Sequence, residues 1–134
     1  MARIAYFDCF SGISGDMILG GLFACGGDPD AFQMTMSRLD IGDWSIGLEP
    51  VTRNGIGALR AIVTAQPEAG HGRHLHHIVD MIVAAGLPDK VTRLSVAVFQ
   101  KLAEAEARIH QTDVEALHFH EVGAVDAIVD IVGA

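Results

Sequence analysis

The chain has 134 residues, half of them hydrophobic, and its formal net charge at pH 7 is -8. This length and composition predict one folded domain with a hydrophobic core and exclude a largely disordered chain. The acidic charge argues against a nucleic acid or an anionic membrane surface as the main partner and favours cations.

Membrane insertion and a disulfide framework are also excluded by the sequence. No apolar run approaches the roughly 18 residues that a membrane-spanning helix needs. The two cysteines, Cys9 and Cys25, are too few for a disulfide scaffold. Because the N-terminus does not resemble a secretory leader, we expect a soluble cytoplasmic protein.

The N-terminal region predicts a strand, a glycine loop and a helix. Residues 4–10 form a short apolar run that we expect to be a buried first strand, and the periodicity that follows predicts a helix near 15–25. Backbone N–H groups at the start of such a helix can bind a phosphate. The candidate substrate-binding residues of this loop are Asp8, Ser11, Gly12, Ser14, Gly15 and Asp16.

Two interpretations stay open for the acidic residues of the loop. Asp8 and Asp16 can hold a hard cation beside a phosphate. They can equally be a strand-end aspartate and a first-turn aspartate that the helix dipole favours.

The next segment predicts a helix and a long hairpin. Helical spacing of apolar residues indicates a second helix near 29–39. Apolar residues then alternate on both sides of Asn54-Gly55, which predicts a β-hairpin over residues 44–66, with Pro50 at an edge or a bulge.

Histidines concentrate in the middle of the chain, where positions 71–77 hold four of the seven. A helix near 75–86 would place His76 and His77 within reach of Asp80. Imidazole with carboxylate suits nickel, zinc or iron(II), so His74, His76 and His77 are candidate metal ligands. The alternative is a solvated histidine-rich loop with incidental metal affinity.

A long structural helix is predicted over residues 88–110. A second group of histidine and carboxylate side chains follows it. In an extended segment near 116–120, His118 and His120 share one face while Phe119 points into the apolar packing. A last helix near 122–134 would place Asp126 and Asp130 on one acidic face. The candidate metal ligands here are His118, His120, Glu121 and Asp126. Structural histidines and a dipole-stabilised acidic helix remain the alternative.

The fold class predicted from these elements is α/β. We expect one small mixed β-sheet, made of the first strand and the long β-hairpin, covered by about five helices. The last helix is strongly apolar and reaches the terminus without a cap, so we expect the chain to be a piece of a longer protein.

Three segments together resemble one known family. They are Y-F-D-C-F-S-G-I-S-G-D-M at 6–17, the histidine-rich loop at 71–77, and H-F-H-E-V-G-A-V-D at 118–126 with the I-V-D-I-V-G that follows. On these motifs the chain is similar to the N-terminal portion of the LarC family, the nickel insertion proteins for the nickel-pincer cofactor of lactate racemase. The resemblance covers essentially the whole chain.

The resemblance implies a cyclometallase of the lyase class. Its members insert nickel into pyridinium-3,5-bisthiocarboxylic acid mononucleotide, form nickel–sulfur bonds and a nickel–carbon bond, and consume CTP. Family members are longer, and the CTP site with manganese or magnesium belongs to a C-terminal nucleotide-binding domain that this sequence lacks. Residues 1–134 would be a single N-terminal domain whose partners are the mononucleotide, the C-terminal domain and possible further copies of itself.

Within this family the residues suggest roles, which are our hypotheses. Imidazole and carboxylate ligands would deliver nickel to the two sulfur atoms of the substrate. Glu121 or His120 would accept the proton that leaves the metallated carbon. Two other functions stay open: a non-catalytic metal-binding or oligomerisation module, and a metal-dependent phosphohydrolase that uses Asp8 and Asp16.

Overall fold

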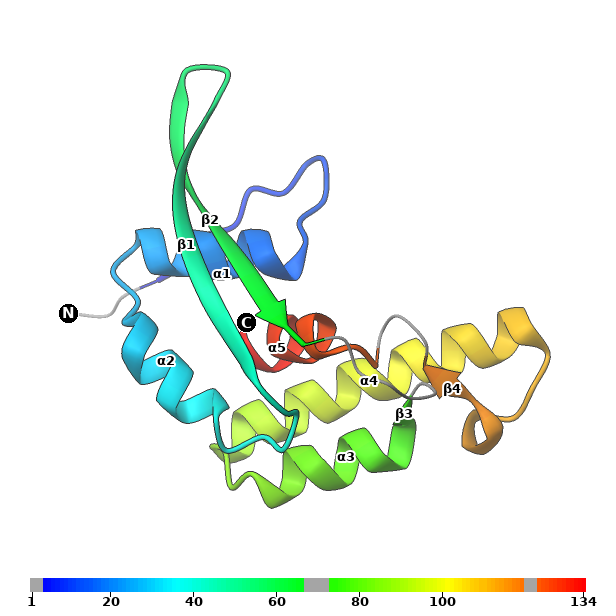
Figure 1. Ribbon diagram of the computed structural model, residues 1–134. Helices are drawn as coiled ribbons and strands as arrows, with labels where there is room; N and C mark the ends of the chain where they lie inside the picture. Colours follow the sequence, from blue (N-terminus) through cyan, green and yellow to red (C-terminus); the bar gives the residue numbers. More distant parts are fainter. Residues whose placement is uncertain (1–3, 67–72, 120–122) are drawn as a thin grey trace.

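The computed structural model describes residues 4–66, 73–119 and 123–134 (Figure 1). The described part contains five α-helices, confirming the predicted number. They are α1 (Gly15–Ala24), α2 (Pro29–Met36), α3 (Leu75–Ala84), α4 (Asp89–His110) and α5 (Val125–Gly133). None of these helices is long and apolar enough to cross a membrane.

Local chemistry sets the ends of these helices. At α2 the Asp28 carboxylate accepts hydrogen bonds from the backbone N–H groups of Asp30 (3.0 Å) and Ala31 (3.2 Å), and Pro29 occupies the first helical position. Helix α4 ends where Gln111 adopts a left-handed conformation with φ of 52°. The last helix begins at Val125, three residues later than the 122 that the sequence predicts.

The long hairpin is confirmed. Strand β1 (Trp44–Arg53) pairs antiparallel with β2 (Ile56–Ala65), in register from Trp44 opposite Ala65 to Arg53 opposite Ile56. The turn residues Asn54 and Gly55 have φ of 50° and 81°, the two positive values that a tight primed turn requires. The far half of the hairpin projects well beyond the helices (Figure 1).

The predicted first strand is wrong. Residues 4–9 form no strand, and their side chains are exposed except for the half-buried Cys9. Among the described residues the hairpin sheet therefore consists of β1 and β2 alone. Strand propensity describes one segment, whereas a strand needs a neighbouring edge to pair with and a surface to cover it. The described part of the chain brings neither to residues 4–9.

A second, very short sheet joins distant parts of the chain. Strand β3 (Arg73–His74) pairs antiparallel with β4 (His118–Phe119), and His74 lies opposite His118. The short strand predicted near 116–120 is therefore confirmed, and its partner is the segment that begins α3.

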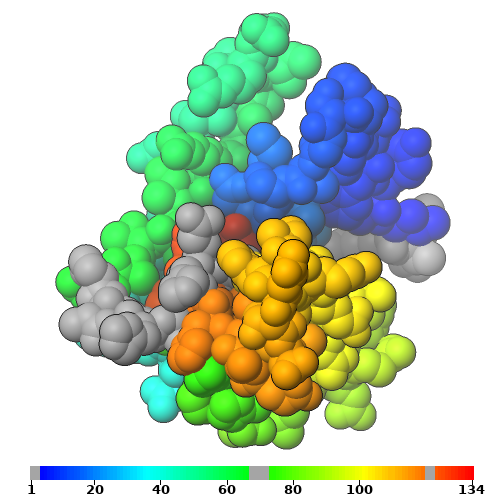
Figure 2. Space-filling view, turned by 90° about the vertical axis from the view of Figure 1, so that its right-hand side faces the viewer, coloured from blue at the N-terminus to red at the C-terminus, as the bar shows by residue number. Residues whose placement is uncertain are grey.

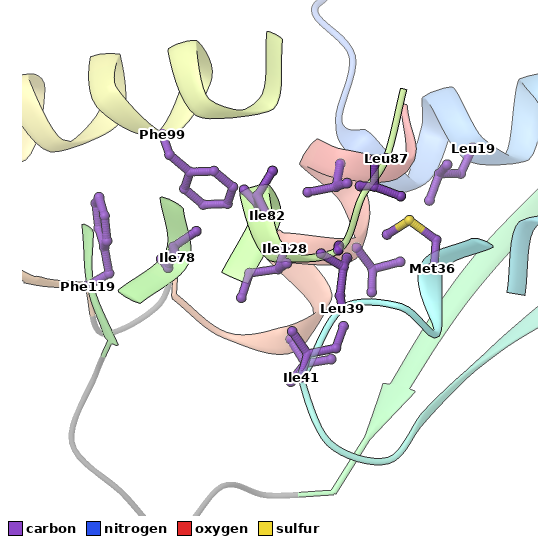
Figure 3. Close-up of a cluster of buried hydrophobic side chains, with 14 of the residues drawn as sticks. Leu19, Met36, Leu39, Ile41, Ile78, Ile82, Leu87, Phe99, Phe119 and Ile128 are labelled. Carbon is purple, nitrogen blue, oxygen red and sulfur yellow. The ribbon is translucent and has the colours of Figure 1, made fainter. Parts of the chain in front are cut away.

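The core lies where α3, α4 and α5 meet the short sheet and the loop after α2 (Figure 3). Phe119 is fully buried, and its ring packs edge-on against Phe99 of α4 with centroids 6.4 Å apart. The other fully buried large side chains are Leu19, Ile41, Ile78, Ile82, Ile128 and Val129.

Helix α1 lies directly against β2, and a glycine allows the approach. A Cβ added to Gly20 would lie 2.2 Å from the backbone carbonyl oxygen of Leu59, whereas a Cβ added to Gly21 would meet nothing within 4 Å. The two neighbouring glycines of one helix therefore have opposite structural roles.

Gly20→Ala should lower the free energy of unfolding by about 1–3 kcal/mol, because helix and strand must move apart. Gly21→Ala should raise it by roughly 0.5–1 kcal/mol, because alanine restricts the unfolded chain and favours helix. Urea denaturation of both variants checks this. Equal effects would show that α1 is not packed against β2.

Candidate functional site

Four histidine side chains from two distant segments come together beside the short sheet. The ring centroids of His74 and His118 are 3.8 Å apart. His76 and His77, in the first turn of α3, have ring centroids 5.3 and 5.6 Å from that of His74, and 4.1 Å from each other. We call these four residues the histidine cluster.

The sequence predicts these histidines as two separate sets of metal ligands, and the structure combines them. Antiparallel pairing places His74 opposite His118, and the start of α3 brings His76 and His77 alongside. His74 Nδ1 is 3.1 Å from the backbone carbonyl oxygen of Leu117, a contact that orients this ring.

The cluster gathers nitrogen donors without forming a complete metal site. Across residues 4–66, 73–119 and 123–134, no three or more His, Cys, Asp or Glu side chains are arranged to hold an ion. Metal ligation by His74, His76, His77 and His118 therefore stays a prediction. His120 and Glu121 lie outside the described residues, although the chain places them directly after Phe119.

A tight contact connects the short sheet to the start of α5. The guanidinium of Arg73 donates a hydrogen bond to the carbonyl oxygen of Gly123 at 2.6 Å. A Cβ on Gly123 would lie 2.9 Å from the carbonyl oxygen of Phe119, so only glycine fits here without movement. The histidine cluster and the acidic helix α5 are thereby fixed relative to each other.

Three carboxylates gather where the N-terminus of α1 meets α5: Asp16, Asp126 and Asp130, which we call the acidic cluster. An added Cβ on Gly15 would lie 2.4 Å from the Asp130 Cβ, so this glycine lets the two helices touch. The Asp130 Oδ1 atom is buried and has no hydrogen-bond partner among the described residues.

The acidic cluster changes the titration of Asp130. Burial, followed by repulsion from the carboxylates of Asp16 and Asp126, raises the pKa of Asp130 from its ordinary 3.8 to about 6. A hydrogen bond from the backbone N–H of Asp16 lowers this pKa by a smaller amount. Three carboxylates this close together favour a proton or a bound cation.

Asp130 is the site residue that the sequence analysis did not select. The sequence does show that Asp130 is four residues from Asp126, a spacing that places both on one helix face. The signal could not show that Asp16, more than one hundred positions earlier in the chain, lies beside them.

The predicted substrate loop divides into two parts. Ser14, Gly15 and Asp16 lie at the start of α1, where the Ser14 hydroxyl donates a hydrogen bond to the Asp16 carboxylate. Asp8, Ser11 and Gly12 lie in the exposed segment before it, where the Gly12 N–H donates to the Cys9 carbonyl at 3.0 Å.

Phosphate binding at this loop is not tested and stays a prediction. The start of α1 already faces the Asp130 carboxylate, and a phosphate there would meet the negative charge of the acidic cluster. A cation between phosphate and carboxylates would remove that repulsion.

Two hollows flank the histidine cluster. The larger has a volume of about 530 Å³ and is lined by Arg38, Asp40, Arg73, His77, Asp80, Met81 and Ala84. The smaller, of about 290 Å³, shares Asp80 with the first and is lined by Leu75, His76, Val79, Asp80, Val114 and Glu115. The larger hollow falls in the range of small-ligand sites.

Imidazoles gathered from distant segments, beside carboxylates and a ligand-sized hollow, are typical of proteins that handle transition metals. Comparison with known families specifies the metal. The family model described as nickel insertion protein matches residues 5–134, and the chain belongs to this family.

Individual relatives of the chain are also named as nickel insertion proteins. The chain is 48% identical over 134 residues to a putative nickel insertion protein of Synechococcus elongatus. It is 47% identical over 132 residues to the pyridinium-3,5-bisthiocarboxylic acid mononucleotide nickel insertion protein of Desulfitobacterium hafniense. These matches cover 99% and 98% of this chain but 33% of each relative. No solved structure matches the chain.

Asp130→Asn tests the acidic cluster. Folding raises the pKa of Asp130, so the folded protein holds the Asp130 proton more tightly than the unfolded chain does. The stability that this proton adds to the fold is complete below pH about 4 and is lost as the pH rises through 6. An asparagine side chain at this position does not titrate. The free energy of unfolding of the variant, relative to that of wild type, should therefore increase between pH about 4 and 6 and then stay constant. Since Asp130 is only partly buried, solvent screening limits the gain to on the order of 1 kcal/mol.

Urea denaturation of wild type and variant at several pH values measures this difference. Asp40→Asn, which removes an exposed carboxylate outside the acidic cluster, is the matched control and should show no such growth. A difference between wild type and Asp130→Asn that is constant with pH would contradict the assignment.

Proposed function

We propose that this chain handles nickel for its insertion into pyridinium-3,5-bisthiocarboxylic acid mononucleotide, the substrate named for several of its relatives. The histidine cluster is the observation that carries the proposal. It presents four imidazoles, the ligand type that suits Ni(II), with the rings of His76, His77 and His118 all within 5.6 Å of the His74 ring.

The chemistry of transfer favours ligands of this kind. The two thiocarboxylate groups of the substrate supply soft sulfur atoms, which bind nickel more strongly than imidazole and carboxylate do. A protein that holds nickel through a few neutral imidazoles can therefore release it to the substrate. An incomplete donor set suits delivery better than a closed structural site would.

The substrate needs a place beside the metal. The larger hollow shares His77 with the histidine cluster and carries Arg38 and Arg73 on its wall. We propose that the mononucleotide enters there, with an arginine near its phosphate and its sulfur atoms toward the imidazoles. The loop that includes Ser11, Gly12 and Ser14 is the second candidate for the phosphate.

Formation of a nickel–carbon bond in the pyridinium ring displaces a proton from that carbon. We propose Glu121 or His120 as the acceptor, because the chain places both directly after the strand that holds His118. Asp126, in the first turn of α5, completes the proposed metal ligands.

The complete reaction belongs to a longer protein in this proposal. The chain spans about a third of the relatives that it matches. We propose that the remaining part binds CTP with manganese or magnesium, that the whole protein is a cyclometallase of the lyase class, and that its product serves lactate racemase. The two free cysteines fit a reducing, cytoplasmic setting.

A non-catalytic nickel-binding module is the second candidate, since the described histidines form no complete ion site. It shares nickel binding with the first proposal and differs in transferring none to the substrate. No observation favours a phosphohydrolase, because Asp8 lies in the exposed segment before α1.

Changing both members of the closest imidazole pair tests the metal role. His74→Ala/His118→Ala should weaken Ni(II) binding by at least about tenfold, because two neighbouring donors are lost. Isothermal titration calorimetry measures the affinity, and circular dichroism confirms that the double variant is folded.

The matched control is His110→Ala, which removes an exposed histidine at the end of α4. It should leave the affinity unchanged. Equal Ni(II) affinity in wild type, the double variant and the control would exclude the histidine cluster as the nickel site.

A further inference from the structure

An apolar surface at the N-terminus of the chain has no cover among the described residues. Ile4, Tyr6 and Phe10 are 89%, 86% and 93% exposed. Ile13 and Met17, slightly further along the chain, are also exposed. Single exposed apolar side chains are ordinary, but five within one short stretch mark an interaction surface. We call these five residues the N-terminal apolar face.

The backbone of the same region also has no strand partner among the described residues, although residues 4–9 have the composition of a buried strand. In the hairpin, β1 and β2 each have one strand neighbour in the described part, so each offers an open edge. Such edges are templates for adding a strand.

The two features stand next to an open space. Figure 2 shows the far end of the hairpin and the N-terminal segment projecting from the body of the molecule, with a gap between them. Helix α1 packs against β2 at the base of this gap, through Gly20. A further layer of polypeptide can therefore enter from the outside without moving the core.

The length of the relatives offers a candidate for this space. The matches cover 98–99% of this chain, including the whole N-terminal apolar face, but only about a third of each relative. We propose that the polypeptide making up the other two-thirds of these proteins packs on the N-terminal apolar face and adds a strand to residues 4–10.

A second copy of the chain is the competing occupant. A segment joined to the same chain has an effective concentration in the millimolar range, far above the usual concentration of a separate copy. The tethered segment is therefore expected to occupy the N-terminal apolar face in preference to a second copy. This inference does not depend on nickel chemistry.

Amide hydrogen exchange of two proteins tests the proposal: this chain, and the full-length relative from Synechococcus elongatus. In the full-length protein the region that aligns with residues 4–14 should exchange at least about 100-fold more slowly than in this chain. The region that aligns with α4 should exchange alike in both and is the internal control.

Three results would overturn the proposal. Rapid exchange of this region in both proteins would mean that nothing covers it. Protection in the 134-residue chain at every concentration would mean that the segment is already folded. Protection that grows with the concentration of this chain would assign the surface to a second copy.

A pair of matched variants gives an independent result. In a chimera that carries this chain in place of the matched third of the relative, Phe10→Ser should raise the unfolding equilibrium constant roughly tenfold or more, because a buried ring is lost. Ile109→Ser, at a residue 76% exposed on α4, should leave it unchanged. Equal effects of the two variants would contradict the docking surface.

Discussion

The burial of Phe119 is the constraint on which the candidate site depends. Its ring is fully buried against Phe99 of α4, so β4 can lie in only one orientation. Alternation along the strand then turns His118 to the opposite, exposed face. Pairing with β3 places His74 opposite His118, and α3 begins immediately after. An apolar contact in the core thus assembles a polar cluster at the surface.

Packing around Phe119 also connects the histidine cluster to the acidic cluster. Gly123 packs on Phe119 and accepts a hydrogen bond from Arg73, so the chain enters α5 in a fixed position. Asp126 and Asp130 follow on that helix, and Gly15 allows α1 to bring Asp16 against them. The positions of these two groups of candidate metal ligands therefore depend on close packing at two glycines, where Gly123 approaches the Phe119 backbone and Gly15 approaches the Asp130 side chain.

Much of this arrangement was predictable from sequence, and the exceptions have physical causes. Periodicity and turn chemistry predict the five helices and the Asn54-Gly55 hairpin, because those signals are local. The alternation of His118 with Phe119 is also local and is confirmed for these two residues. The first strand at 4–10 is wrong because strand formation requires a partner that the described chain does not supply. The meeting of His74 with His118 was not predictable, since it depends on pairing between distant segments, and the same holds for Asp130 beside Asp16.

The histidine cluster is the proposed nickel-binding site. X-ray absorption spectroscopy at the nickel edge, on this chain loaded with one equivalent of Ni(II), tests that claim most directly. If nickel binds there, the spectrum should show nearest neighbours that are nitrogen and oxygen atoms, together with the outer-shell scattering of at least two imidazole rings. That imidazole scattering should be lost in His74→Ala/His118→Ala. A shell of oxygen atoms alone, or imidazole scattering that the double substitution leaves unchanged, would contradict it.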